Sequence, residues 1–532
     1  MQTSNGSSES RQWNTVDTAT VLLGHHHLRF GIDYRRLHSI LTPPNNDAEA
    51  VFESPESVLT NSADLLYIVK RDNATPSFNE TGVFIQDEWK ATPDLTLSLG
   101  LRWEVNPSPN SPPYTLLGNL NVPSSLILAP RGTPLWKTTW YNFAPRLGAS
   151  WLVHDAARWE TVVRAGGGVF FDTDNELATQ GYGGVGFTAM NYLFGVALPA
   201  VSSDFNFAPS LTPPYTSSSI YAFPAHLQLP YALEWNAALQ QALGAKQALT
   251  ISYVASNGRR LLQQQELNLS DLTANFGTIY YLKNGVTSNY QSLQASFQRT
   301  LRNGIQVLAA YTWGHSLDFG SNSFALPLTR GNSDFDVRNT ASAGLTWDLP
   351  FIHDHTPVQA LISHWSLDGR LMARTAFPVT LQGNLLTDQG SGSTYFGNVN
   401  YDPSKPLYLY GSQFPGGRAI NGGPLAENPA ITTAGGSSAG NAPRNFMRGF
   451  NATQVNLALH REIPLHEAFR LQLRAEAFNM LNHPNFGYVD PNLNDQTFGQ
   501  ATQSLSQSLG TVSALYQQGG ARSLQIALKI LF

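Results

Sequence analysis

The chain repeats one pattern many times, in which apolar and polar side chains alternate strictly over about ten residues. In residues 231–240 the apolar positions are Tyr231, Leu233, Trp235, Ala237 and Leu239, with Glu234, Asn236 and Gln240 between them. Successive side chains of a β-strand point to opposite faces, whereas a helix would scatter these residues around its circumference. Each segment therefore predicts a strand with one apolar and one polar face.

About fifteen segments share this pattern and predict an all-β chain. They cover residues 13–22, 28–38, 82–90, 94–104, 141–153, 159–172, 231–242, 246–256, 289–299, 304–315, 338–349, 361–375, 452–461, 467–479 and 521–532. Their usual length of ~9–11 residues is what a tilted strand needs to cross the hydrocarbon layer, whereas soluble strands are usually ~5–6 residues long. The segments therefore predict an antiparallel transmembrane β-barrel.

Connections between the segments alternate between short and long. Thr92–Pro93, Gly244–Ala245 and Arg302–Asn303 lie in short turns. The long connections are 105–140, 173–230, 255–288, 316–337, 376–451 and 480–520. Bacterial barrels have short periplasmic turns and long extracellular loops. With the short turns in the periplasm, the strands at 13–22 and 521–532 both run inward, and residues 1–12 begin inside an external loop.

Composition agrees with a barrel and excludes other classes. Charged residues make up 13% of the chain, against ~25% in an ordinary soluble protein, and there is no cysteine. We find no apolar run of about 18 residues that could cross a bilayer as a helix. The net charge of −5 leaves no basic excess for phosphates, so nucleic acid is excluded as a partner. The expected surroundings are outer-membrane lipid.

Several motifs resemble one known family. The run EAFNMLNHPNF, from Glu476 to Phe486, resembles the EAFNxxNHPNF run near the end of Oar-like TonB-dependent receptors, which are outer-membrane transporters. Similar stretches are Phe84–Trp89, Phe143–Gly148, Val163–Gly168 followed by Phe170–Asp172, and Tyr290–Gln294. The resemblance extends over nearly the whole chain.

The resemblance implies a parent barrel of ~22 strands with a plugged lumen. The family normally has a signal peptide, a regulatory-like β-sandwich and a plug with the segment that engages TonB, and none is visible here. We therefore interpret residues 1–532 as a partial receptor barrel, and expect it either to close as a smaller strained barrel or to stay open or distorted.

As function, the resemblance implies uptake of a substrate such as a siderophore, cobalamin or glycan by the full-length parent. TonB would act through the missing N-terminal region. A porin-like or surface-adhesive barrel without TonB coupling is the alternative, and an outer-membrane enzyme is less favoured. A signal peptide in the DNA upstream, with no plug, would favour the alternative.

The last strand has the most specific local signal. Its apolar face consists of Leu524, Ile526, Leu528, Ile530 and Phe532. An ordinary amphipathic edge strand could end in an aromatic residue by chance. A terminal aromatic with this alternation nevertheless resembles the signal that the barrel-assembly machinery reads, and we assign these five residues to it.

Tryptophans recur near the ends of the predicted strands. They are Trp89, Trp103, Trp151, Trp235, Trp313, Trp347 and Trp365. Aromatic girdles lie at both interfaces of membrane barrels. A soluble core could account for any one of these residues, but not for their repeated position.

Four other groups suggest chemistry that we do not expect. His25–His27 and His353–His355 hold neighbouring side chains that point in different directions and converge poorly on a metal ion. His315, Asp318, Asp334 and Asp336 lie on a predicted external loop, where such residues are usually just solvated. Gly166–Gly168 lies in a strand without a following Lys-Ser/Thr, so it is not a phosphate loop. We expect it to let the strand bend or the plug approach. No catalytic, cofactor or metal residue is predicted.

Overall fold

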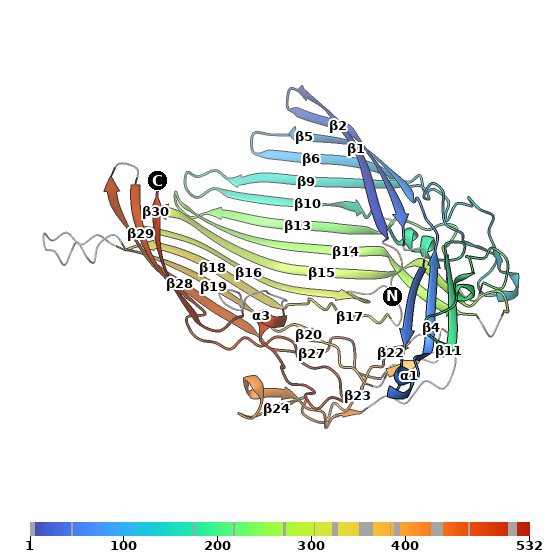
Figure 1. The fold of residues 1–532 in the computed structure, drawn as a ribbon. Helices are drawn as coiled ribbons and strands as arrows, with labels where there is room; N and C mark the ends of the chain where they lie inside the picture. The colour runs from blue at the N-terminus through green and yellow to red at the C-terminus, as the bar shows by residue number, and fades with distance from the viewer. Residues whose placement is uncertain are drawn as a thin grey trace.

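One antiparallel sheet contains all fifteen strands predicted from the alternation (Figure 1). In spatial order they are β1 (Ser7–Leu23), β2 (His26–Thr42), β5 (Ser77–Lys90), β6 (Leu95–Val105), β9 (Asn142–His154), β10 (Thr161–Phe171), β13 (Tyr231–Ala242), β14 (Gln247–Asn268), β15 (Thr278–Arg302), β16 (Ile305–Asp318), β18 (Asn339–Asp348), β19 (Trp365–Arg374), β28 (Ala452–His466), β29 (Phe469–Phe478) and β30 (Ser523–Leu531). Each pairs with the next, so the all-β prediction is confirmed.

The computed structural model describes most of the chain. It covers residues 6–43, 46–173, 176–215, 219–269, 273–302, 304–321, 328–349, 365–383, 385–387, 394–426, 440–466, 469–508 and 519–532. No helix within these ranges is long and apolar enough to cross a membrane.

The register of the sheet converts the alternation into two faces. In β15, Leu293 pairs with Tyr253 and Trp313 on what we call the apolar face. The neighbouring Gln294 pairs with Ser252 and Thr312 on the polar face. Side chains of the apolar face are exposed: Trp313 is 55% and Leu147 63% accessible. An exposed apolar band of this kind is what a surrounding lipid phase requires.

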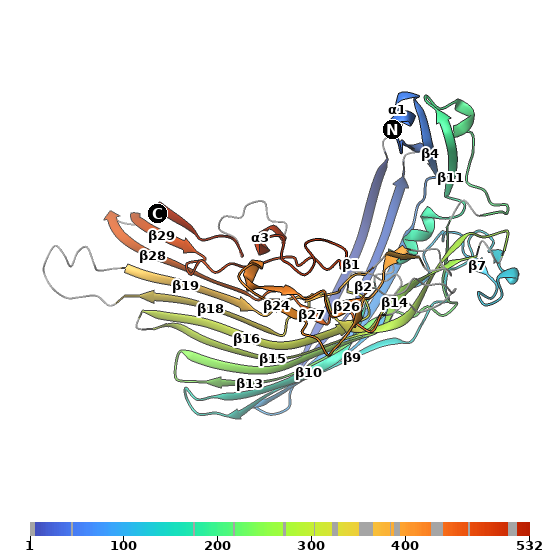
Figure 2. The same ribbon diagram turned by 90° about the horizontal axis from the view of Figure 1, so that it is seen from below.

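The sheet curves into an open trough, with β1 at one edge and β30 at the other (Figure 2). Among the described residues, β1 pairs with β2 alone and β30 with β29 alone. Of the expected alternatives, the open form is therefore the one found. Both edges leave backbone donors and acceptors without a strand partner.

The turns that join β1 to β2, β5 to β6, β9 to β10 and β13 to β14 lie at one end of the sheet, together with the C-terminus, and β1 begins at the other end (Figure 1). The second end, where the long connections lie, is called the loop end. Two expectations here were wrong. β1 begins at Ser7, so residues 7–12 belong to a strand. The predicted loop 255–288 is largely strand, since β14 continues to Asn268 and β15 starts at Thr278.

The projecting parts of β14 and β15 pair with each other beyond a register shift between Gly258 and Leu262. A β-bulge of this kind bends a strand and increases its twist. The segment 263–268 extends about six residues, or roughly 20 Å at ~3.3 Å per residue, past the bulge. This segment is held as a strand by backbone hydrogen bonds to β15, and such bonds cannot be inferred from the alternation of apolar and polar residues.

The long connections are themselves folded. β3 (Asn46–Val51), β4 (Ser62–Arg71) and β11 (Thr188–Ala197) form a separate sheet beside α1 (Pro55–Leu59), whose N-cap is Ser54. The remaining strands are β7 (Leu116–Leu117), β8 (Ile127–Leu128), β12 (Ile220–Ala222), β17 (Gly331–Asn332), β20 (Pro378–Val379), β21 (Leu385–Thr387), β22 (Thr394–Phe396), β23 (Asn400–Tyr401), β24 (Tyr408–Tyr410), β25 (Arg418–Ile420), β26 (Leu425–Ala426) and β27 (Met447–Arg448). The remaining helices are η1 (Pro123–Ser125), η2 (Glu176–Gly183), η3 (Ser202–Phe205), η4 (Pro415–Gly417) and α3 (Leu505–Ser508).

Buried apolar clusters hold these connections in place. One cluster joins Leu126, Val185, Ile220 and Phe276 from three connections. Another joins Leu381, Ile420, Met447 and Val489. Because each cluster combines segments far apart in the sequence, the loop end has a fixed shape.

Candidate functional site

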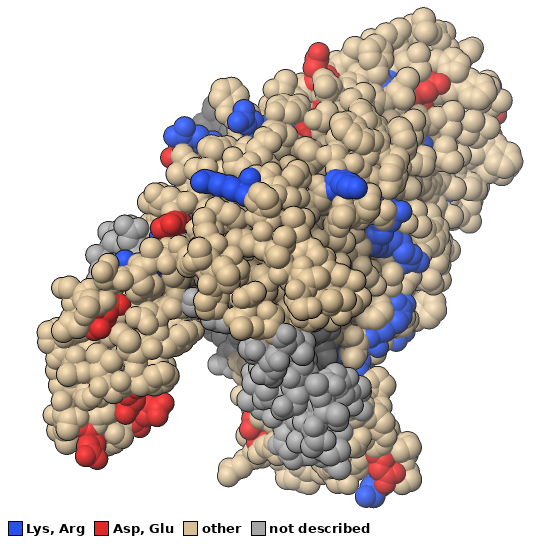
Figure 3. Space-filling model, turned by 90° about the vertical axis from the view of Figure 1, so that its right-hand side faces the viewer, with Lys and Arg blue, Asp and Glu red and all other residues tan. Residues whose placement is uncertain are grey.

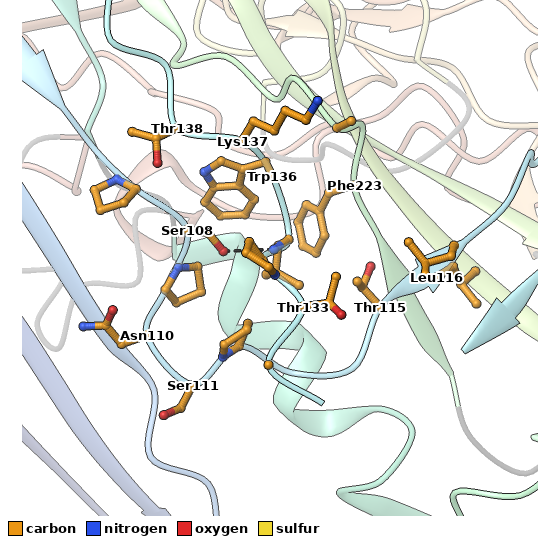
Figure 4. A pocket seen from close by; sticks show the side chains of 18 of the residues that line it. Ser108, Asn110, Ser111, Thr115, Leu116, Thr133, Trp136, Lys137, Thr138 and Phe223 are labelled. Carbon is orange, nitrogen blue, oxygen red and sulfur yellow. Dashed lines mark hydrogen bonds between the residues drawn. The ribbon is translucent and has the colours of Figure 1, made fainter. Parts of the chain in front are cut away.

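A cavity of about 990 Å³ opens at the loop end, in the connection between β6 and β9 (Figure 4). Its walls come from residues 107–118 and 132–140, with Phe223 and Ala225 from the segment after β12. Trp136 is buried and meets Phe223 edge to face, with ring centroids 5.4 Å apart. Four prolines, Pro107, Pro109, Pro112 and Pro134, line the same walls and restrict the backbone.

Polar groups surround these rings. The Ser108 hydroxyl accepts a hydrogen bond from the Leu135 amide at 2.9 Å, which ties the two walls together. At the rim, Tyr182 donates to the Ser111 carbonyl at 2.8 Å, and burial raises the pKa of Tyr182. Within the described chain, the side chains of Asn110, Ser111 and Thr138 have no hydrogen-bond partner. The cavity thus presents free polar groups beside aromatic rings.

The acidic residues of the predicted external loop do come together, but with arginines. We call Asp318, Asp334, Asp336, Arg338, Arg444 and Arg448 the Arg–Asp cluster. Arg444 pairs with Asp318 and, at 3.0 Å, with Asp334. Asp336 pairs with Arg448 and, at 3.1 Å, with Arg338. The cluster therefore joins the connection before β18 to the connection before β28.

Asp336 is the most buried member, with 1% of its side chain exposed. Its carboxylate also accepts hydrogen bonds from the Ser316 amide at 2.7 Å and lies 3.1 Å from the His315 ring. Burial alone would raise the pKa of Asp336. The opposing effects are larger: the carboxylate is stabilised by hydrogen bonds from Arg448, Ser316 and His315 and by the charge of Arg338. The pKa of Asp336 therefore lies below its usual value. A carboxylate held ionised in this way is a structural anchor and a poor general base.

Because the folded pKa of Asp336 is depressed, we predict that the cluster is stable above the unfolded Asp pKa of about 3.9 and weakens only as the pH falls through the lower folded value. The backbone amides of residues 331–338 should therefore be equally protected from hydrogen exchange at pH 7 and pH 5. Their protection factors should fall only below about pH 4. Loss of protection between pH 7 and pH 5 would contradict this assignment.

The histidines at the first turn do not converge. The His26 Nδ1 atom lies 2.7 Å from an Asp87 carboxylate oxygen, and the His26 ring stacks on Trp89. His27 lies instead beside Glu88, at 3.6 Å. Across the described ranges, no group of three or more His, Asp or Glu residues could hold a metal ion. His353–His355 lies outside the described residues.

Gly166–Gly168 lies in the middle of β10, where the neighbouring strands approach closely. A Cβ atom on Gly167 would lie 3.0 Å from the Glu234 carbonyl oxygen. A Cβ atom on Gly168 would lie 2.9 Å from Arg146 Cγ and 3.0 Å from the Pro145 carbonyl oxygen. Because Gly168 has no side chain, Arg146 can cross this position, and its guanidinium lies 4.4 Å from the centre of the Phe170 ring.

We predict that Gly168→Ala destabilises the sheet by about 1–3 kcal/mol, because the added methyl group has no space and neighbouring backbone must shift. Gly344→Ala in β18 is the matched control, since nothing lies within 4 Å of its Cβ position. Thermal unfolding in detergent, followed by heat-modifiable gel migration, would compare them. Equal midpoints would contradict the crowding at Gly168.

Four of the residues predicted as the assembly signal, Leu524, Ile526, Leu528 and Ile530, lie on the exposed apolar face of β30, and Phe532 follows the last residue of that strand. Ile526 is 90% and Phe532 94% exposed, and Leu528 pairs with Leu473 of β29. Among the predicted girdle tryptophans, Trp89 and Trp151 lie near the short turns and Trp103 lies near the loop end. Trp313 lies away from both ends, since it pairs with Leu293.

The sequence patterns did not identify the cavity or the arginines of the cluster. The Pro-rich stretch 107–113 next to Trp136 and Trp140 is a signal that could have drawn attention to the cavity. The pairing of Arg444 with Asp318 spans 126 residues, and no local pattern reports it.

The family model described as an outer membrane beta barrel domain matches residues 1–525. The chain therefore belongs to the outer membrane beta-barrel family, and it is a protein of the bacterial outer membrane.

Among solved structures, the outer membrane transporter YddB from Escherichia coli is 12% identical, with a TM-score of 0.54 and coverage of 98% of this chain and 54% of that chain. A ferric enterobactin receptor from Pseudomonas aeruginosa is 12% identical, with a TM-score of 0.47 and coverage of 98% and 54%. The FrpB iron transporter from Neisseria meningitidis is 11% identical, with a TM-score of 0.46 and the same coverage. No curated protein sequence matches the chain. The chain spans about half the length of these structures, and the likeness to YddB concerns the fold alone.

Proposed function

We propose that the chain is the barrel of an Oar-like TonB-dependent receptor, which takes up a substrate across the outer membrane. Uptake belongs to the whole protein, with TonB as the partner that supplies energy through a plug region outside this sequence. The external substrate is first captured at the loop end. Residues Leu524, Ile526, Leu528, Ile530 and Phe532 are recognised by the barrel-assembly machinery.

The observation that supports this proposal best is the contrast between the two ends of the sheet. One end has short turns, whereas the other has connections ordered by buried clusters, an Arg–Asp cluster and a cavity of about 990 Å³. Ordered loops with a cavity suit capture of a particular ligand. The family motif at Glu476–Phe486 supports the receptor subtype.

The test uses cells that produce the natural protein, a deletion strain and a strain without TonB. Each receives a fluorescent ferric siderophore, cobalamin and a neutral oligosaccharide. We expect at least one probe to accumulate in the producing cells and to be lost in both other strains. Accumulation that persists without TonB would favour a porin-like channel and contradict the proposal, as would no difference for any probe.

A further inference from the structure

We propose that the cavity between residues 107–118 and 132–140 binds a neutral oligosaccharide. The inference rests on the proposed function, because it names the substrate class that the loop end captures. It requires three properties of the cavity: aromatic rings for the faces of sugar rings, free polar groups for hydroxyls, and little net charge.

Aromatic rings form the first part of the site. Trp136 and Phe223 lie at the inner wall, while Trp140 lies at the rim and is 62% exposed. Trp103 holds Trp140 in place, since its Nε1 atom donates to the Trp140 carbonyl at 2.7 Å and the two rings stack at 6.4 Å. The negative face of an indole attracts the weakly positive C–H groups on one face of a sugar ring. A fixed and exposed Trp140 therefore suits stacking against a sugar.

Hydroxyl and amide groups form the second part. Asn110, Ser111 and Thr138 line the cavity and have free side chains within the described chain. Thr115 and Thr133 line it too, but each donates to a backbone carbonyl, at 3.3 and 2.7 Å. Hydroxyl and amide groups both donate and accept, which matches the hydroxyls of a sugar. Figure 4 shows Asn110 and Ser111 on one wall and Thr115 and Thr133 on another.

Charge distinguishes a sugar from an anionic ligand. Among the described residues lining the cavity, Lys137 is the one charged side chain, and it is exposed at the rim. The face of the molecule at the loop end is mostly uncharged, with several lysine and arginine side chains spread across it (Figure 3). Recognition of an anion uses charge-assisted hydrogen bonds from several cations, above all arginine. The arginines of the Arg–Asp cluster pair with aspartates instead, and Arg131, which precedes the lining residue Gly132, is not part of the cavity lining.

The size of the cavity favours several sugar units over one. Small-ligand sites usually have volumes of ~300–1,000 Å³, and about 990 Å³ lies at the upper end of this range. We therefore expect oligosaccharides to bind better than monosaccharides.

The test measures binding to the protein purified from outer membranes in detergent, by calorimetry and tryptophan fluorescence. The probes are maltotetraose, cellotetraose, xylotetraose, their monosaccharides and a ferric catecholate. We expect a neutral tetrasaccharide to bind, and Trp140→Ala and the double change Asn110→Ala with Ser111→Ala each to raise its Kd at least tenfold. Trp140→Phe should restore much of the affinity, because it keeps an aromatic face.

Two further variants serve as controls. Trp159→Ala removes a tryptophan that is 55% exposed outside the cavity and should not change the Kd by more than about twofold. Lys137→Met removes the rim charge and should leave tetrasaccharide binding measurable, because the proposed recognition of a neutral sugar does not depend on that charge. The proposal is overturned if no neutral oligosaccharide binds, or if Trp140→Ala leaves the Kd of the tetrasaccharide unchanged. It is also overturned if the ferric catecholate binds instead and its Kd rises in Lys137→Met. Binding is measured without transport, so failed uptake with intact binding would contradict the proposed function alone.

Discussion

Leu293→Arg should prevent most of the protein from accumulating as a folded species in the outer membrane, while Gln294→Arg should have little effect. Leu293 lies near the middle of β15 on the apolar face, between Tyr253 and Trp313, and is 46% exposed. An arginine facing lipid at the bilayer midplane costs about 2–4 kcal/mol. Heat-modifiable migration of outer-membrane fractions measures the folded fraction.

Gln294→Arg is the matched control, because the residue is adjacent in β15 and lies on the opposite face of the sheet. It lies on the polar face between Ser252 and Thr312, where an added cation can remain hydrated. If both variants folded equally well, or if Gln294→Arg were the more damaging, the apolar face would not be the lipid-facing one.

Asp336→Ala should release the connections of the loop end without unfolding the sheet. The change leaves Arg448 and Arg338 without their buried carboxylate and removes the acceptor of the Ser316 amide. Losing one partner of a buried ion pair costs about 3–5 kcal/mol, and the partial exposure of the arginines lowers our expectation to about 2–3 kcal/mol. Hydrogen exchange in residues 331–338 and 440–450 should accelerate roughly 30-fold or more.

Arg131→Met is the control for this experiment, because Arg131 is exposed and makes no ion pair within the described chain. Its exchange should match that of the natural protein. Unchanged exchange in Asp336→Ala would mean that the buried apolar clusters alone order the loop end, and faster exchange across β13–β16 would mean that the cluster supports the whole sheet.

The alternation could predict the fifteen long strands because burial in lipid acts on every second residue, whatever its neighbours are. The same reasoning failed at Gln263–Asn268, where polar side chains occupy both faces and pairing with β15 alone defines the strand. It also failed for β3 and β4, since a small sheet outside the membrane needs no sustained alternation.

The candidate site was harder to foresee than the sheet. The acids of 315–336 lie close together in the sequence, but two of their arginine partners, Arg444 and Arg448, follow more than a hundred residues later. The cavity combines Trp136 with Phe223. These residues lie in different connections, between β6 and β9 and between β10 and β13, and they meet only when the strands of the sheet are paired. Contacts of this kind depend on the completed fold, whereas strand periodicity is local.

The most direct test of the membrane sheet is a spin-label scan of β15. The chain has no cysteine, so single cysteine substitutions at each position from Ser292 to Gln298 can be labelled uniquely in the natural protein in lipid bilayers. We predict that collision rates with oxygen peak at 293, 295 and 297, and that those with a water-soluble nickel complex peak at the even positions between them. Equal exposure of both faces to the nickel complex, or a period near 3.6, would contradict a lipid-facing β-sheet.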